Sequence, residues 1–135
     1  MTTHVWERDL VIVACAISAG IHGALVKEHF DEGFGAGMGF LVSTVLLAVY
    51  AVALTGAAEH VVLASTVLLM AGLLAAYAFA VTTGVPVLHP EVESVDGLAL
   101  FTKAVELCAL AASLHLLAAG RVPRRLILET ERTLT

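Results

Sequence analysis

Four long apolar stretches, separated by short polar segments, fill most of the chain. They cover about residues 10–26, 38–54, 61–81 and 98–119. Each approaches the ~17–25 residues that an α-helix needs to cross about 30 Å of hydrocarbon. None alternates like a barrel strand, and backbone polar groups in lipid must be paired within the segment. The pattern predicts an all-α, integral membrane four-helix bundle, a single domain over residues 1–120.

Composition excludes most other classes of protein. Of the 135 residues, 59% are hydrophobic and 14% charged, against roughly 45–50% and 25% in soluble domains. No basic face suited to nucleic acid occurs, so no nucleic-acid partner is expected. The chain also lacks a phosphate-binding Walker loop and a Gly-x-Ser-x-Gly nucleophile elbow. The sequence names no reaction, and the absence of a catalytic motif favours a role other than an enzyme.

Basic residues near the predicted spans indicate the orientation. The tail at residues 121–135 holds four arginines, whereas the segments after the first and third spans hold only Lys27. We therefore expect both termini in the cytoplasm, with residues 27–37 and 82–97 as loops on the other side. The basic, amphipathic tail suits the anionic surface of the lipid bilayer. The short link at residues 56–60 predicts that the second and third helices form an antiparallel hairpin.

Small residues recur at close spacing in three places. Such residues let helix backbones approach in lipid. The pattern predicts close helix contacts, either within one chain or at the seam of a homodimer or larger membrane complex. The sets are Ala16, Gly20 and Ala24; Ala104, Cys108 and Ala112; and Gly33, Gly35, Gly37 and Gly39.

Imidazole and carboxylate groups gather towards the predicted outer side. His22 and His29 are seven residues apart and return to within ~20° of one helix face, and Cys15 and Ser18 continue this polar seam inwards. Mixed imidazole and carboxylate ligands suit copper, zinc or iron. A transition-metal site on this side is therefore the first functional hypothesis, with candidate ligands His22, Glu28, His29, Glu32, His89 and Glu106.

The fourth apolar stretch contains two charged residues three positions apart. Lys103 and Glu106 are close enough on a helix to pair, and pairing lowers the cost of charge at membrane depth. They form either an ion pair that fixes the packing of the bundle or a proton relay. Glu106 is also a candidate ligand of the metal. His115, nine residues after Glu106, points to another face. Asp96 is placed to cap the helix that begins near Gly97.

Further hypotheses remain open. His60 and His115 both lie near the predicted cytoplasmic side, at levels compatible with the axial ligands of a b-type haem. The chain could instead be a non-catalytic accessory or structural subunit that acts through its lipid-embedded surface. A proton or ion transport component that uses His22, Lys103 and Glu106 is the remaining alternative.

Two short stretches carry a resemblance to a group of known proteins. Ala19-Gly20-Ile21-His22 through Glu28-His29, and Thr82-Thr83-Gly84-Val85-Pro86, are similar to segments of small uncharacterised four-span membrane proteins from high-GC Gram-positive bacteria. The resemblance implies a multi-pass protein of the bacterial plasma membrane. It implies no activity for any residue.

Overall fold

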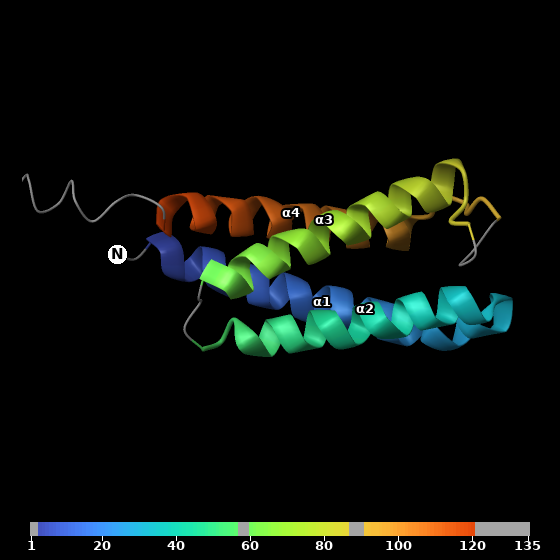
Figure 1. The fold of residues 1–135 in the computed structure, drawn as a ribbon, viewed down its shortest axis with the longest axis horizontal. Helices are drawn as coiled ribbons and strands as arrows, with labels where there is room; N and C mark the ends of the chain where they lie inside the picture. Colours follow the sequence, from blue (N-terminus) through green and yellow to red (C-terminus); the bar gives the residue numbers. More distant parts are fainter. Residues whose placement is uncertain (1–2, 57–59, 87–90, 121–135) are drawn as a thin grey trace, which may run out of the picture.

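The computed structural model describes residues 3–56, 60–86 and 91–120, which form four long helices (Figure 1). Each helix is long and apolar enough to cross a membrane, which confirms the predicted number and type of elements. The helices are α1 (Thr3–Glu32), α2 (Phe34–Ala53), α3 (His60–Thr82) and α4 (Gly97–Gly120).

Helix α1 is central to the packing. It contacts both α2 and α4, and α3 packs on α4. Successive helices run antiparallel, so the N-terminus, the α2–α3 connection and the end of α4 lie at one end of the bundle (Figure 1). The predicted hairpin of α2 and α3 is open, because these two helices contact each other little. Two helix pairs are thus joined through α1 and α4.

The connection between α1 and α2 differs from the predicted loop at residues 27–37. Both helices extend into this segment, and Gly33 alone separates them. The last turns of α1 are supported by Lys27, whose ammonium lies 2.6 Å from the Asp31 carboxylate. The ring of Phe30 packs so closely on Gly37 that a side-chain carbon there would overlap it. Gly37 therefore lets α1 and α2 meet closely at their shared end.

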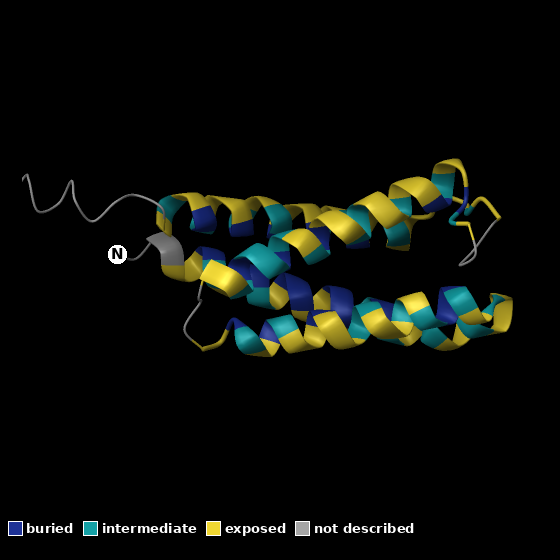
Figure 2. Ribbon diagram, viewed as in Figure 1, coloured by how far each residue is buried: buried dark blue, intermediate teal, exposed yellow. Residues whose placement is uncertain are grey.

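The buried face of each helix points towards the midline of the bundle, and the outer faces are largely apolar and exposed (Figure 2). Exposed apolar side chains such as Val49, Leu68 and Phe79 suit contact with lipid. The core cluster consists of Val11, Ala14, Cys15, Ala19, Leu47, Ala51, Leu54, Leu63, Met70, Ala109 and Leu117.

The small-residue stripe on α1 does not pack within the chain. Ala16, Gly20 and Ala24 are exposed, and a side-chain carbon at Gly20 would meet nothing within 4 Å. The within-chain alternative is therefore wrong for this stripe, because the face with Cys15 and Ser18 is the one turned inwards. The homodimer alternative stays a prediction.

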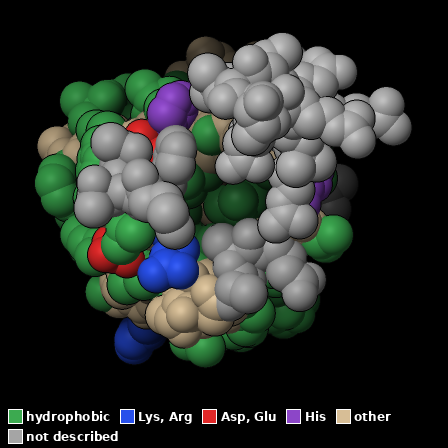
Figure 3. Space-filling view, turned by 90° about the vertical axis from the view of Figure 1, so that its left-hand side faces the viewer, with side chains coloured by type: hydrophobic (Ala, Val, Ile, Leu, Met, Phe, Trp, Pro, Cys, Tyr) green, Lys and Arg blue, Asp and Glu red, His purple; other side chains and the backbone are tan. Residues whose placement is uncertain are grey.

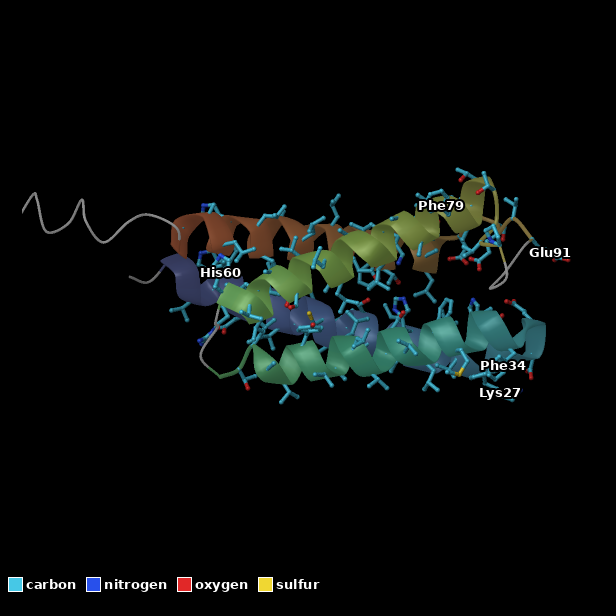
Figure 4. The ribbon with its side chains drawn as sticks, viewed as in Figure 1. Lys27, Phe34, His60, Phe79 and Glu91 are labelled. Carbon is cyan, nitrogen blue, oxygen red and sulfur yellow. The ribbon has the colours of Figure 1, made fainter. Side chains whose placement is uncertain are left out.

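The connection between α3 and α4 is tied to both helices. The Asp96 carboxylate accepts a 2.7 Å hydrogen bond from the Ala99 amide, which confirms the predicted cap of α4. The Glu93 amide donates to the Ala80 carbonyl of α3 at 2.9 Å. Glu91 lies at the end of the bundle where α1 meets α2 (Figure 4). The predicted ligand His89 and the basic tail at 121–135 lie outside the described residues.

Candidate functional site

A carboxylate is completely buried in the middle of the bundle. Glu106 of α4 has an exposed fraction of 0%. Its Oε1 accepts a hydrogen bond from the Ser18 hydroxyl of α1 at 2.7 Å, and its Oε2 accepts one from the Lys103 ammonium at 2.6 Å. The predicted pair of Lys103 and Glu106 is confirmed. Because both oxygens have partners, the cost of burying this charge is reduced.

His22 of α1 completes the buried group. Its Nδ1 lies 2.9 Å from the Ser18 carbonyl oxygen, and its Nε2 lies 3.9 Å from Oε1 of Glu106. A carbonyl oxygen only accepts hydrogen bonds, so Nδ1 carries the hydrogen of the neutral imidazole. Nε2 then presents a lone pair to a carboxylate. One additional proton on either group would allow a hydrogen bond between the His22 imidazole and the Glu106 carboxylate.

The same arrangement recurs nearer the end of α1. Nδ1 of His29 lies 2.9 Å from the Leu25 carbonyl oxygen, and Nε2 lies 4.0 Å from a carboxylate oxygen of Glu32. The Phe40 ring of α2 stacks on His29 with a centroid distance of 3.5 Å, and its centroid is 5.2 Å from that of His22. A second histidine–carboxylate pair thus lies between the buried site and the helix end.

The predicted metal ligands separate into these two pairs. His22 meets Glu106, His29 meets Glu32, and Glu28 is exposed. Among the described side chains, no group of three or more His, Cys, Asp or Glu residues could hold a metal ion. The oxygens of Glu106 are engaged by Ser18 and Lys103 instead. Metal binding stays a prediction that this geometry does not favour.

The two candidate haem ligands lie near the opposite end of the bundle. His60 is exposed at the start of α3 (Figure 4). Nδ1 of His115 lies 3.0 Å from the Glu7 carboxylate of α1. His115 is therefore engaged by an acid, and haem binding also stays a prediction.

Three contacts of the site were not foreseen from the sequence. The Ser18 hydroxyl reaches Glu106 across the α1–α4 interface, Glu7 reaches His115, and the Lys103 ammonium lies 5.4 Å from the centroid of the Tyr77 ring of α3. The seam through Ser18 and His22 was a signal for the first contact, but its partner depends on which helix lies beside α1.

Searches with protein-family models, curated proteins and solved structures found no match to this chain.

Proposed function

We propose that this chain is a multi-pass membrane protein that transfers protons across the bilayer, with His22 and Glu106 as its buried proton-binding site. The supporting observation is the distance of 3.9 Å between Nε2 of the buried His22 and Oε1 of the buried Glu106. Two acceptors at this separation repel each other and are drawn together when one proton binds between them. Ionisable groups inside a membrane bundle commonly belong to proton or ion pathways.

The outer pair, His29 and Glu32, can deliver the proton to the buried site. The Glu32 side chain is 44% exposed and that of His29 only 12%, so water reaches the carboxylate first. A proton that binds Nε2 of His29 must then travel to His22, seven residues or about 10 Å further along α1. Phe40 lies against both imidazoles, so movement of this ring controls the space between them.

Transfer within the buried site needs only a small movement. A separation of 3.9 Å between Nε2 of His22 and Oε1 of Glu106 exceeds the ~2.7–2.9 Å of a charged hydrogen bond by about 1 Å. Rotation of the imidazole closes this gap. The N–H bond at Nε2 then breaks, an O–H bond forms at Oε1, and the imidazole returns to its neutral state with Nδ1 still bonded to Ser18.

Lys103 makes the bound proton easy to release. With His22 neutral, the charges of Lys103 and Glu106 cancel, and both side chains are largely removed from water. Adding one proton leaves the site with a net positive charge in a poorly solvated place, which is costly. A proton therefore binds transiently and moves on, as transfer requires.

Orientation and location belong to the same proposal. The arginines of the tail favour cytoplasmic termini by the positive-inside rule, and the bacterial plasma membrane is the proposed location. The His29–Glu32 pair then faces the outside. The main alternative is an accessory subunit in which Lys103 and Glu106 only fix the packing.

Proton flux into liposomes tests the proposal. Purified protein is reconstituted with a pH-sensitive dye inside, and a potassium gradient with valinomycin drives protons inwards. We expect Glu106→Gln to reduce the flux at least tenfold, because the amide cannot accept the proton. Glu28→Gln, which removes an exposed acid from α1, should conduct like the unchanged protein.

Each other outcome has a defined meaning. Equal flux in Glu106→Gln and the unchanged protein would contradict the proposal. Flux no greater than in protein-free liposomes, with a folded protein by circular dichroism, would favour the accessory subunit. Flux that stops when a chelator removes copper, zinc or iron would favour the predicted metal site.

A further inference from the structure

A third histidine–carboxylate pair lies at the opposite end of α1. Glu7 is buried, with an exposed fraction of 9%, and its carboxylate lies 3.0 Å from Nδ1 of His115. The side chain of His115 is 62% exposed. A buried acid is thus in direct contact with an imidazole that reaches the surface. Figure 3, which views this end, shows a histidine beside an acidic side chain at the edge of the apolar surface.

The three pairs are spaced along the full thickness of a membrane. Glu7 and Glu32 are separated by 25 positions of one continuous helix, which corresponds to about 37 Å at ~1.5 Å per residue. A hydrocarbon core is about 30 Å thick. The His29–Glu32 pair and the Glu7–His115 pair therefore fall near the two boundaries of this core, and His22 with Glu106 lies between them.

A hydroxyl group between Glu106 and the opposite end has no hydrogen-bond partner among the described residues. Oγ of Ser113 is fully buried and makes no hydrogen bond with any described residue. A buried hydroxyl without a hydrogen-bond partner destabilises the folded state, and such a group is a common position for internal water. In contrast, six other hydroxyls in the described helices donate to the carbonyl four residues earlier: Ser43, Thr44, Ser65, Thr66, Thr82 and Thr102.

Ser113 lies on the route from the buried site to the opposite pair. It follows Glu106 by seven residues, so it returns to the same face of α4 about 10 Å further along. Ala109, one turn after Glu106, is fully buried, as is Cys15, one turn before Ser18. Both side chains are small.

We infer that Glu7 and His115 form the second mouth of the proton path, and that Ser113 binds the water that connects this mouth to Glu106. This inference rests on the proposed function. The O–H bond of Glu106 breaks and its proton joins a water molecule, which restores the carboxylate. The proton then passes along water at Ser113 to the Glu7 carboxylate, and from there to His115 and bulk water.

Other titratable groups lie at the same end of the bundle as Glu7. Arg8 and Asp9 are its neighbours on α1, and the Arg8 Nε is 4.0 Å from the Asp9 carboxylate. His60 of α3 lies at the same end (Figure 4). Glu7 is the acid among them that is buried, which makes it the group suited to receive a proton from the interior.

Variants of the second half of the path test the inference. Glu7→Gln removes the acid, and Ser113→Val fills the place of the hydroxyl with a methyl group. We expect each to slow the liposome flux at least fivefold, while infrared spectroscopy of the same protein still detects protonation of Glu106 from the outer side. Ser113→Thr keeps a hydroxyl and should retain most of the flux. Thr66→Val is the matched control, because Thr66 is buried but its hydroxyl bonds its own helix.

The outcomes separate this inference from the proposed function. If Glu7→Gln and Ser113→Val conduct normally while Glu106→Gln does not, the second mouth lies elsewhere and the inference is overturned. If Glu106→Gln itself conducts normally, the proposed function fails and the inference with it. Should Ser113→Val fail to fold, Ser113→Ala is measured instead, and normal flux in that variant overturns the role of Ser113.

Discussion

The two sides of α1 make different kinds of interface. On the side of α2, Phe30 fits against Gly37, and a carbon added at Gly23 would lie 3.2 Å from the Thr44 methyl. On the side of α4, the contacts are the polar ones of Ser18 and of His22 with Glu106. One helix therefore combines a seam held by shape with a seam held by charge and hydrogen bonds.

This difference indicates separate roles for the two seams. Close packing of small residues supports helix association in lipid, where apolar surfaces gain little from leaving their surroundings. Buried charge adds little stability of its own and is sensitive to the loss of any partner. We therefore assign fold maintenance chiefly to the α1–α2 seam and the buried proton-binding site to the α1–α4 seam.

The largest effect on stability is expected from removing one charge of the α1–α4 seam. Lys103→Met leaves Glu106 buried without its cation, which should lower the free energy of unfolding by about 3–5 kcal/mol. The double variant Lys103→Met, Glu106→Gln should recover most of this loss. Unfolding in mixed detergent micelles measures both.

An exposed pair provides the matched control for that experiment. Lys27 lies as close to Asp31 as Lys103 does to Glu106, at 2.6 Å, but the Lys27 side chain is 87% exposed. Lys27→Met should therefore cost only about 0.3–0.5 kcal/mol. Similar losses for Lys27→Met and Lys103→Met would show that burial of Glu106 does not make its pairing important.

A smaller loss is expected on the α1–α2 seam. In Gly37→Ala the new methyl group overlaps the Phe30 ring, and the resulting strain should cost about 1–3 kcal/mol. Gly39→Ala on the same helix meets nothing within 4 Å and should be neutral or slightly stabilising. Proton flux per folded molecule should be unchanged in both. A selective loss of flux in Gly37→Ala would contradict the division between the seams.

Apart from the control variants, the smallest effect on stability is expected from a single hydroxyl. Ser18→Ala removes one hydrogen bond to Glu106, and such bonds in membrane bundles contribute about 0.6 kcal/mol on average. Its flux should nevertheless fall severalfold, because Ser18 helps to position the carboxylate. Ser43→Ala removes a hydroxyl that bonds only its own helix and should leave the flux unchanged. An unchanged flux in Ser18→Ala would limit Ser18 to a structural role.

Much of the fold could be predicted from local patterns. Apolar length gave the four helices, three-residue spacing gave the Lys103–Glu106 pair, and the position of Asp96 before an apolar run gave the cap of α4. These features depend on one helix at a time. The extension of α1 to Glu32 was harder to predict, because the support that Phe30 obtains from Gly37 involves a second helix.

The site depends on which helices are neighbours, and a single sequence does not contain that information. The seam of Ser18 and His22 was visible on α1, but not that α4 rather than α3 would lie beside it. The outer positions of His22 and His29, with Glu106 deeper in the bundle, suggested one metal cluster. In the structure these residues belong to separate pairs, because helical rise sets His29 about 10 Å beyond His22.

Infrared difference spectroscopy of Glu106 in reconstituted membranes tests the central claim most directly. We predict that acidifying the outer side produces the carbonyl band of a protonated carboxyl group, that deuterium oxide shifts this band, and that Glu106→Gln lacks it. The band should appear over the same pH range in which proton flux rises. A band that is also present in Glu106→Gln, or proton flux with no change at Glu106, would contradict the account.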